Sequence, residues 1–206
     1  MASGVFIIAS IGKAAESRVA AIQRDFDPKL AATSPPHLTI AGSSGVGPIC
    51  APVTVRELRA ALEPIASTTA PLVLPFGPPH HFMQTTIVVL PLDPHGPLRV
   101  LHDRIAASGL PFERPRFTFT PHTTLSFHRT HDPETLKRLL AIRVEELAVI
   151  DRISVQLTED PQPSKTLLEL RLSGTTDGAG ALVGGGDVTR VGARPSGRPL
   201  RRGARE

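Results

Sequence analysis

A short pattern that occurs twice constrains this chain more than any other feature. The sequence PHLTI places His37 two residues before Thr39, and PHTTL places His122 two residues before Thr124. Each pattern stands in a run of residues typical of a strand, in which residues i and i+2 point to the same face. Each segment should therefore present an imidazole and a hydroxyl side by side.

The segments that precede the two patterns have the same order of elements. Residues 4–11 are predicted to form a buried strand, and apolar spacing predicts a helix over residues 13–26 ahead of the first pattern. A strand over residues 85–92 and a helix with Leu98 and Leu101 on one face likewise precede the second pattern. The sequence therefore predicts an α+β fold of two related lobes, each with one pattern.

The remaining elements are predicted from caps, alternation and turn residues. Thr54 and Glu57 form a capping-box pattern at the start of a helix, and Asp132 with Pro133 suits the first positions of another. GSSGVGP is predicted to be a loop and GPPHHFMQ a turn. Strands are expected over residues 71–76, 117–127, 152–158 and 167–172, the last two as an antiparallel hairpin.

The positive charge of the chain is concentrated at its C-terminal end. Residues 175–206 contain six Arg and no Lys against three acidic residues, which is +3 of the formal net charge of +4. Residues 1–174 then carry +1, too little for the broad basic surface of a duplex-binding protein. We expect residues 1–174 to be the folded domain and the Gly- and Arg-rich residues 175–206 to be a disordered tail.

Cysteine content and hydropathy bear on the cellular compartment. Cys50 is the only cysteine, so no intrachain disulfide and no thiolate metal cage can form. No apolar run approaches the roughly 18 residues of a membrane helix. The apolar GVFIIASIG lacks the basic flank of a signal peptide and is interpreted as a core strand. We expect a cytoplasmic monomer without membrane association.

The paired side chains suit in-line displacement at phosphorus. One neutral imidazole can take a proton from the attacking water or hydroxyl while the other, protonated, gives one to the leaving oxygen. The hydroxyls of Thr39 and Thr124 can donate hydrogen bonds to the non-bridging oxygens. The imidazolium and these hydrogen bonds handle the phosphate charge, so no metal or other cofactor is expected. The residues leave open which histidine is the acid.

The other histidine patterns in the sequence do not predict a catalytic or metal site. A third His-x-Thr match, His128 to Thr130, lacks the preceding proline and is attributed to chance or to a rim contact. The neighbours His80 and His81 have no carboxylate or thiolate at ligand spacing, so they do not predict a metal site.

PHLTI and PHTTL resemble the two H-x-T-x motifs of the 2H phosphoesterase superfamily, which includes the 2′-5′ RNA ligase and RNA 2′,3′-cyclic phosphodiesterase proteins. The resemblance covers residues 4–172 in layout. It implies two pseudo-symmetric lobes, each an antiparallel-rich sheet with helices outside, around a central cleft. It also implies opening of a 2′,3′-cyclic phosphate to a 2′-phosphate. By this resemblance His37 is the general acid, His122 the general base, and Thr39 and Thr124 the phosphate-holding hydroxyls.

The chain departs from the best-known subfamily after each motif. AGSSGVGP follows the first motif where that subfamily has an aromatic–Leu–Gly pattern. After the second motif three residues intervene before Arg129, where the subfamily often has an arginine two residues past the leucine. Arg129, or Arg116 and Arg114 ahead of the motif, are therefore the candidate arginine contacts to phosphate.

Any base stacking must use phenylalanine, since the chain has no Trp or Tyr. Phe82, in the predicted turn, is the preferred candidate for a substrate contact. Phe117, Phe119 and Phe127 share one alternating register on the face opposite His122 and are predicted to be core residues.

These observations predict a metal-independent phosphodiesterase that opens the 2′,3′-cyclic phosphate of an RNA end or a small nucleotide. A 2′-5′ RNA ligase-like enzyme that runs the same chemistry in reverse is a close alternative. A non-catalytic protein that binds nucleotides or RNA ends is a third. The measured rate separates these hypotheses, because only an enzyme loses turnover when a motif histidine is replaced.

Overall fold

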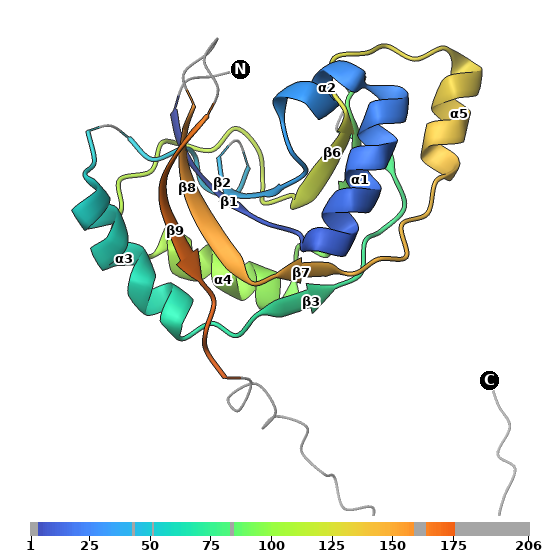
Figure 1. Cartoon of the computed structure of the whole chain (residues 1–206). Helices are drawn as coiled ribbons and strands as arrows, with labels where there is room; N and C mark the ends of the chain where they lie inside the picture. The colour runs from blue at the N-terminus through green and yellow to red at the C-terminus, as the bar shows by residue number, and fades with distance from the viewer. Residues whose placement is uncertain (1–3, 43, 51, 83–84, 159–163, 176–206) are drawn as a thin grey trace, which may run out of the picture. The chain divides into compact units, whose positions relative to one another are not determined.

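Figure 1 shows the computed structural model of the chain, which describes residues 4–42, 44–50, 52–82, 85–158 and 164–175. Within these ranges the chain has an α+β fold, and every pair of neighbouring strands is antiparallel. The predicted tail lies outside the described residues from residue 176 onward, so its disorder stays a prediction.

The larger sheet joins the start of the folded region to its end. Its strands are β1 (Gly4–Ala9), β2 (Leu38–Ala41), β8 (Arg152–Thr158) and β9 (Lys165–Arg171), in the order β2-β1-β8-β9. Along β1, Val5, Ile7 and Ala9 are buried and alternate with partly exposed residues, as expected of a strand with one face on a core. β8 and β9 form the hairpin pair predicted from alternation.

Amphipathic helices cover the sheets. Their bounds are α1 (Lys13–Phe26), α2 (Pro28–Thr33), α3 (Val55–Ser67), α4 (Gly96–Ala106) and α5 (Pro133–Ala141). The predicted capping box is confirmed: the Glu57 backbone N–H donates to Thr54 Oγ1 (3.2 Å) and the Thr54 N–H donates to Glu57 Oε2 (2.8 Å). Asp132 caps α5 by accepting from the backbone N–H groups of Glu134 and Thr135. These bonds satisfy first-turn donors that have no partner inside the helix.

The three-stranded sheet carries the second motif. Its strands are β4 (His80–His81), β5 (Val88–Pro91) and β6 (His122–Ser126), in the order β4-β5-β6. The prediction of a turn at GPPHHFMQ is wrong at its centre, because His80 pairs with Val89 and His81 with Val88. β4 is an edge strand and pairs on one side only among the described strands, so the prolines before it are tolerated. Two further short strands, β3 (Leu72–Leu74) and β7 (Ala148–Ile150), pair with each other.

Each half of the chain supplies a helix to the motif strand of the other half. α1, from the first half, packs against β6, and Figure 1 shows the two side by side. α4, from the second half, contacts β2. The position of each motif therefore depends on a segment far away in the sequence.

The prediction that three phenylalanines ahead of and after β6 belong to the core is correct only for Phe119, which is 8% exposed. Phe117 is 40% and Phe127 44% exposed. The prediction extended strand alternation over residues 117–127, whereas the strand spans only residues 122–126. Phe117 makes a single isolated bridge to Ser44, and Phe127 lies past the strand end, so neither follows the register of β6.

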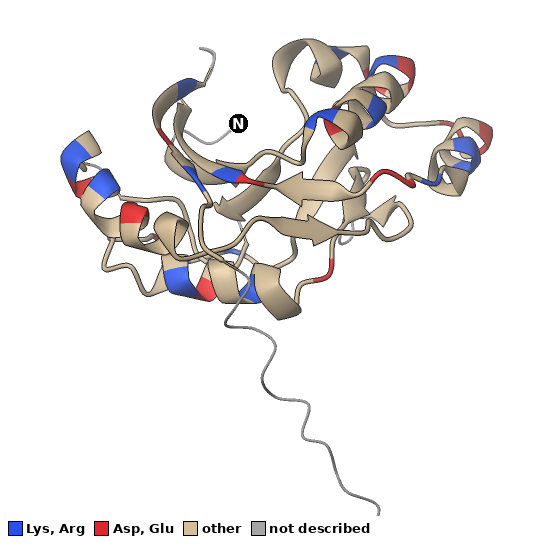
Figure 2. Cartoon of the chain, turned by 60° about the horizontal axis from the view of Figure 1, so that its bottom comes forward, with Lys and Arg blue, Asp and Glu red and all other residues tan. Residues whose placement is uncertain are grey.

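Charged residues of both signs are interspersed along the helices, as Figure 2 shows. This distribution agrees with the small net charge of residues 1–174. None of the described helices has the length and apolar character needed to cross a membrane.

Candidate functional site

The strands that carry the two motifs lie next to each other. β2 is the edge strand of the four-stranded sheet, β6 is the edge strand of the three-stranded sheet, and the two are in contact. The hydroxyl Oγ1 of Thr123 donates to the backbone carbonyl oxygen of His37 at 3.1 Å. This bond links the second motif directly to the backbone of the first.

The two motif histidines have the same local hydrogen bond. Nδ1 of His37 is 2.8 Å from the carbonyl oxygen of Pro35, and Nδ1 of His122 is 2.7 Å from that of Thr120. A carbonyl oxygen only accepts, so Nδ1 carries the proton and Nε2 is the nitrogen with the free lone pair in the neutral ring. Both rings are therefore oriented with Nε2 available for proton transfer.

The prolines of the two motifs explain this shared geometry. Pro36 and Pro121 each stand directly before a motif histidine. A proline restricts the preceding residue to extended conformations, which limits the direction in which that residue's carbonyl points. That carbonyl is the one that receives the Nδ1 proton, so the Pro-His sequence sets the orientation of the imidazole.

The environment favours the neutral form of both rings. Burial lowers the pKa of His37, and the carbonyl of Pro35 opposes this effect. Burial also lowers the pKa of His122, against the opposing carbonyl of Thr120, and the charges of His37 and His80 lower it further. The mutual effect disfavours two imidazolium ions at once. A neutral base beside a separately protonated acid is the arrangement that this coupling allows.

Thr39 and Thr124 are partly exposed. Thr124 lies on the same face of β6 as His122, and Thr39 lies in β2 two residues beyond His37, which immediately precedes that strand. Neither hydroxyl forms a hydrogen bond to another described residue of the chain. Gly42 makes room for the first of them, since a Cβ at residue 42 would lie 2.7 Å from Thr39 Cγ2. Both hydroxyls are thus available to a bound anion.

Helix α1 holds the backbone of the second motif through buried polar side chains. Nε2 of Gln23 donates to the carbonyl oxygen of Thr124 at 2.8 Å. Asp27 follows α1, is fully buried, and accepts from the backbone N–H groups of Phe127 (2.8 Å) and His128 (2.7 Å). Burial raises the pKa of Asp27, but the N–H groups of Phe127 and His128 outweigh it and hold the pKa below its usual value. The carboxylate therefore fixes the end of β6.

The preferred aromatic candidate lies against one of the motif histidines. The ring centroids of Phe82 and His122 are 4.6 Å apart, and Phe82 is 8% exposed. The rings of Phe82 and Phe117 are nearly perpendicular, with centroids 5.9 Å apart, and Phe117 remains substantially exposed. Phe82 therefore contributes to the burial of His122, and Phe117 offers the more accessible ring.

The chain matches the family model described as the 2′-5′ RNA ligase superfamily over residues 12–156, more than half of its length. The chain belongs to the 2′-5′ RNA ligase superfamily. This membership confirms the resemblance to 2H phosphoesterases and supports phosphodiesterase- or ligase-type chemistry. Comparison of the sequence with curated proteins gives no match.

Solved structures of other proteins share the fold of this chain. The protein TT0787 of Thermus thermophilus has a TM-score of 0.60 and 15% identity, over 82% of this chain and 98% of that chain. E. coli LigT in its apo form has a TM-score of 0.54 and 15% identity, over 83% of this chain and 98% of that chain. The likeness confirms the α+β fold with antiparallel sheets. The pseudo-symmetric two-lobe arrangement around a cleft stays a prediction.

The candidate arginines are not brought to the motifs by any contact. Arg114, Arg116 and Arg129 are exposed, and within the described ranges no hydrogen bond or ion pair fixes any of these side chains. The charges that act on His122 are those of His37 and His80. His128, the start of the third His-x-Thr match, is exposed and contributes its backbone N–H to Asp27.

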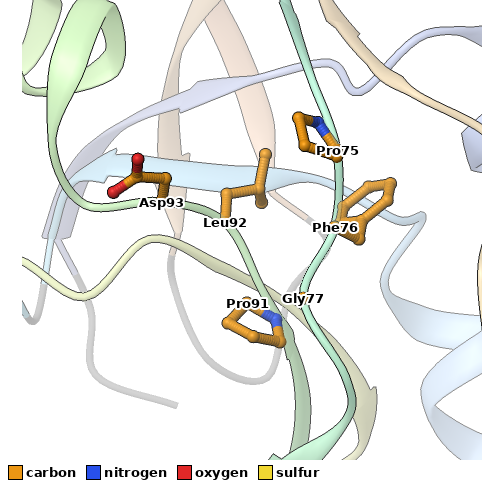
Figure 3. A pocket seen from close by; sticks show the side chains of 6 residues that line it. All are labelled: Pro75, Phe76, Gly77, Pro91, Leu92 and Asp93. Carbon is orange, nitrogen blue, oxygen red and sulfur yellow. The ribbon is translucent and has the colours of Figure 1, made fainter.

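The described residues offer no alternative metal centre, and the hollow beside Pro91 does not suit an anion. No group of three or more His, Cys, Asp and Glu side chains among those residues could hold a metal ion. A hollow near β6, shown in Figure 3, is lined by Pro75, Phe76, Gly77, Pro91, Leu92 and Asp93. Its one charged group is a carboxylate, which would repel a phosphate.

Sequence reasoning missed Gln23, Asp27 and Thr123. Asp27 before Pro28 is a recognisable helix-start signal, and its side chain does cap α2 by accepting from the Leu30 N–H. Its bonds to the end of β6, about a hundred residues further along, leave no local mark in the sequence.

Proposed function

We propose that this member of the 2′-5′ RNA ligase superfamily is a metal-independent phosphodiesterase that opens the 2′,3′-cyclic phosphate of an RNA end or a small nucleotide. The matched orientation of His37 and His122, each with Nδ1 bound to a carbonyl, is the observation that carries this proposal. Two imidazoles on neighbouring strands, both with Nε2 free, supply one proton acceptor and one proton donor.

In the proposed reaction Nε2 of neutral His122 takes a proton from water as the water oxygen forms a bond to phosphorus. The bond from phosphorus to the 3′ oxygen breaks, and Nε2–H of protonated His37 gives its proton to that oxygen. The product carries a 2′-phosphate and a free 3′-hydroxyl. Thr39 and Thr124 donate hydrogen bonds to the non-bridging oxygens, where negative charge accumulates.

The electrostatics of the site support these roles. The lowered pKa of His122 keeps it neutral near pH 7, as a general base must be. Burial also lowers the pKa of His37, but a bound phosphate would favour its protonated form. Substrate binding would therefore prepare the acid, because the anion brings the charge that stabilises the imidazolium.

The nucleotide part of the proposal is supported by complexes of a fold relative. E. coli LigT has been solved in complex with 3′-AMP, with NADP+ and with ATP, at TM-scores of 0.53, 0.54 and 0.51 to this chain. By microscopic reversibility the same two histidines could also join a 5′-hydroxyl to the cyclic phosphate and form a 2′-5′ linkage, which is the ligase-like alternative. The remaining alternative is a non-catalytic protein that binds nucleotides or RNA ends.

The test is turnover of a short RNA that ends in a 2′,3′-cyclic phosphate, with EDTA present throughout. We expect the wild type to form a 2′-phosphate end, and His37→Ala and His122→Ala each to lower the rate by about 10²–10⁴-fold. His95→Ala, an exposed histidine at the start of α4, is the matched control and should leave the rate unchanged. No turnover by the wild type between pH 5 and 9, or full activity in either motif variant, would refute the proposal.

A further inference from the structure

A third histidine has the same local setting as the two motif histidines. In the sequence PPHH, His80 directly follows a proline, as His37 and His122 do. Its Nδ1 is 3.5 Å from the carbonyl oxygen of Pro78, again the residue two positions earlier. At 3.5 Å the contact is weaker than those in the motifs, but it too involves Nδ1, and Nε2 of His80 has no hydrogen bond to another described residue.

The sheet register places His80 on the same face as the second motif. His80 pairs with Val89 on β5, and Val89 pairs with Thr124 on β6. Residues directly opposite each other in an antiparallel pair share a face, so His80 and Thr124 do as well. His81, the next residue, lies on the other face.

Two further observations place His80 near the reacting groups. Phe82, two residues beyond His80 on the same strand side, packs against the ring of His122. The charge of His80 is also one of the two that lower the pKa of His122. His80 itself is exposed, so its Nε2 is open to a ligand.

We propose that His80 binds a second phosphate group of the substrate, distinct from the cyclic phosphate held by Thr39 and Thr124. This inference rests on the proposed function. A protonated His80 donates Nδ1–H towards the carbonyl of Pro78 and Nε2–H to the phosphate oxygen, a charge-assisted hydrogen bond. The substrate class is then an oligonucleotide end, whose terminal phosphodiester supplies the second phosphate, and not a lone cyclic nucleotide.

This role differs from proton transfer, because His80 contacts a phosphate that does not react. At a pH where His122 is neutral with or without His80, loss of His80 should therefore raise KM for substrates with a second phosphate and leave kcat unchanged. For a substrate without that phosphate, KM should be the same in the wild type and in the variant that lacks His80. Arginine at the same position supplies the same charge and donor, so it should preserve the preference.

The experiment compares two substrates with the same terminal base: a dinucleotide ending in a 2′,3′-cyclic phosphate, and the nucleoside 2′,3′-cyclic phosphate. For the dinucleotide we expect His80→Ala to raise KM about tenfold and His80→Arg to keep it near the wild-type value. The nucleoside substrate should show no change in KM with either variant. His81→Ala, on the opposite sheet face, is the matched control and should behave as the wild type with both substrates.

Three results would overturn the role of His80: no effect of His80→Ala, an equal effect on both substrates, or the same effect from His81→Ala. If the wild type turns over neither substrate, the proposed function fails first. Calorimetric binding of the dinucleotide 2′-phosphate and the nucleoside 2′-phosphate then decides the inference. Tighter binding of the dinucleotide, lost in His80→Ala, would support the subsite, and equal affinities in the wild type would refute it.

Discussion

The two motif strands orient their histidines alike but are not held in place in the same way. The back of β2 is apolar, with Leu38 and Ile40 fully buried. The backbone of β6 is bound by side chains of α1 and the turn after it, through Gln23 and Asp27. Leu125 of β6 is fully buried as well. What distinguishes the strands is that β6, and with it the second histidine, also depends on hydrogen bonds from α1 and the turn after it. The second should therefore be disturbed by substitutions that never touch it.

The largest effect should come from Asp27→Ala. It leaves the buried N–H groups of Phe127 and His128 without their acceptor, which should lower the free energy of unfolding by about 3 kcal/mol. Asp25→Ala removes an exposed carboxylate two residues earlier, in α1, and is the control. Urea unfolding of both variants measures the difference. Equal stability of the two variants would show that β6 does not depend on this carboxylate.

The pH dependence of stability tests the same carboxylate. Its pKa is lowered in the folded state, so its stabilising contribution is complete above the unfolded value of about 3.9 and is lost as the pH falls through the folded pKa. The stability difference between wild type and Asp27→Ala should therefore be constant near neutral pH and shrink below about pH 4. A difference that stays constant down to pH 2 would contradict this assignment.

The loop after the first motif depends on a glycine. Gly45 has φ of 78°, and a Cβ there would clash with the buried ring of His102 and with Phe119. Its N–H donates to the carbonyl of Phe117 at 2.9 Å, which connects this loop to the segment before the second motif. Gly45→Ala should cost about 2 kcal/mol from backbone strain and the clash together.

The chain offers a control for the backbone part of that cost. Gly109 has nearly the same φ, 82°, with open space where a Cβ would lie. Gly109→Ala should therefore show only the strain of a left-handed residue, about 1 kcal/mol. Thermal unfolding of both variants gives the comparison, and an equal loss in the two would mean that His102 does not restrict the loop.

Removing the hydrogen bond between the motifs should reduce the free energy of unfolding less than Asp27→Ala or Gly45→Ala does. It should also reduce activity. Thr123→Val keeps the shape of the side chain and removes the hydrogen bond to the His37 carbonyl, which should cost about 1 kcal/mol of stability. Because this bond relates the two histidines to each other, kcat should fall about tenfold while KM changes little. Thr123→Ser keeps the hydroxyl and should restore kcat. A Ser variant as slow as the Val variant would contradict the linking role.

Local signals in the sequence predicted the elements that local forces determine. The capping residues of α3 and α5, the apolar stripe of α1 and the alternation of β8 and β9 all depend on neighbours within a few positions. β4 was missed because its two residues stand among prolines and glycine, and only the partner strand makes them a strand. Phe117 was misplaced because alternation was extended past the end of β6.

The residues of the candidate site also fall into two groups, those that local signals predict and those that act through distant contacts. The two Pro-His-x-Thr patterns were visible because proline, histidine and threonine act over two residues, through the Nδ1 bond and the strand face. Gln23 and Asp27 act across about a hundred residues, and a carboxylate at a helix start has a sufficient local explanation without them. His80 was visible as part of a pair, but its relation to His122 comes from the register of three strands.

The smallest effect should be a shift in the pH profile of the second histidine. Burial is the largest cause of the lowered pKa of His122, and Phe82 packs directly on its ring. The base must be neutral, so the acidic limb of kcat/KM should lie below the ordinary histidine value of about 6.5. Phe82→Ala admits water, so the limb should move upward, while Phe82→Leu should keep most of the burial. An unchanged limb in Phe82→Ala would mean that the neighbouring charges of His37 and His80, and not burial under this ring, keep His122 neutral.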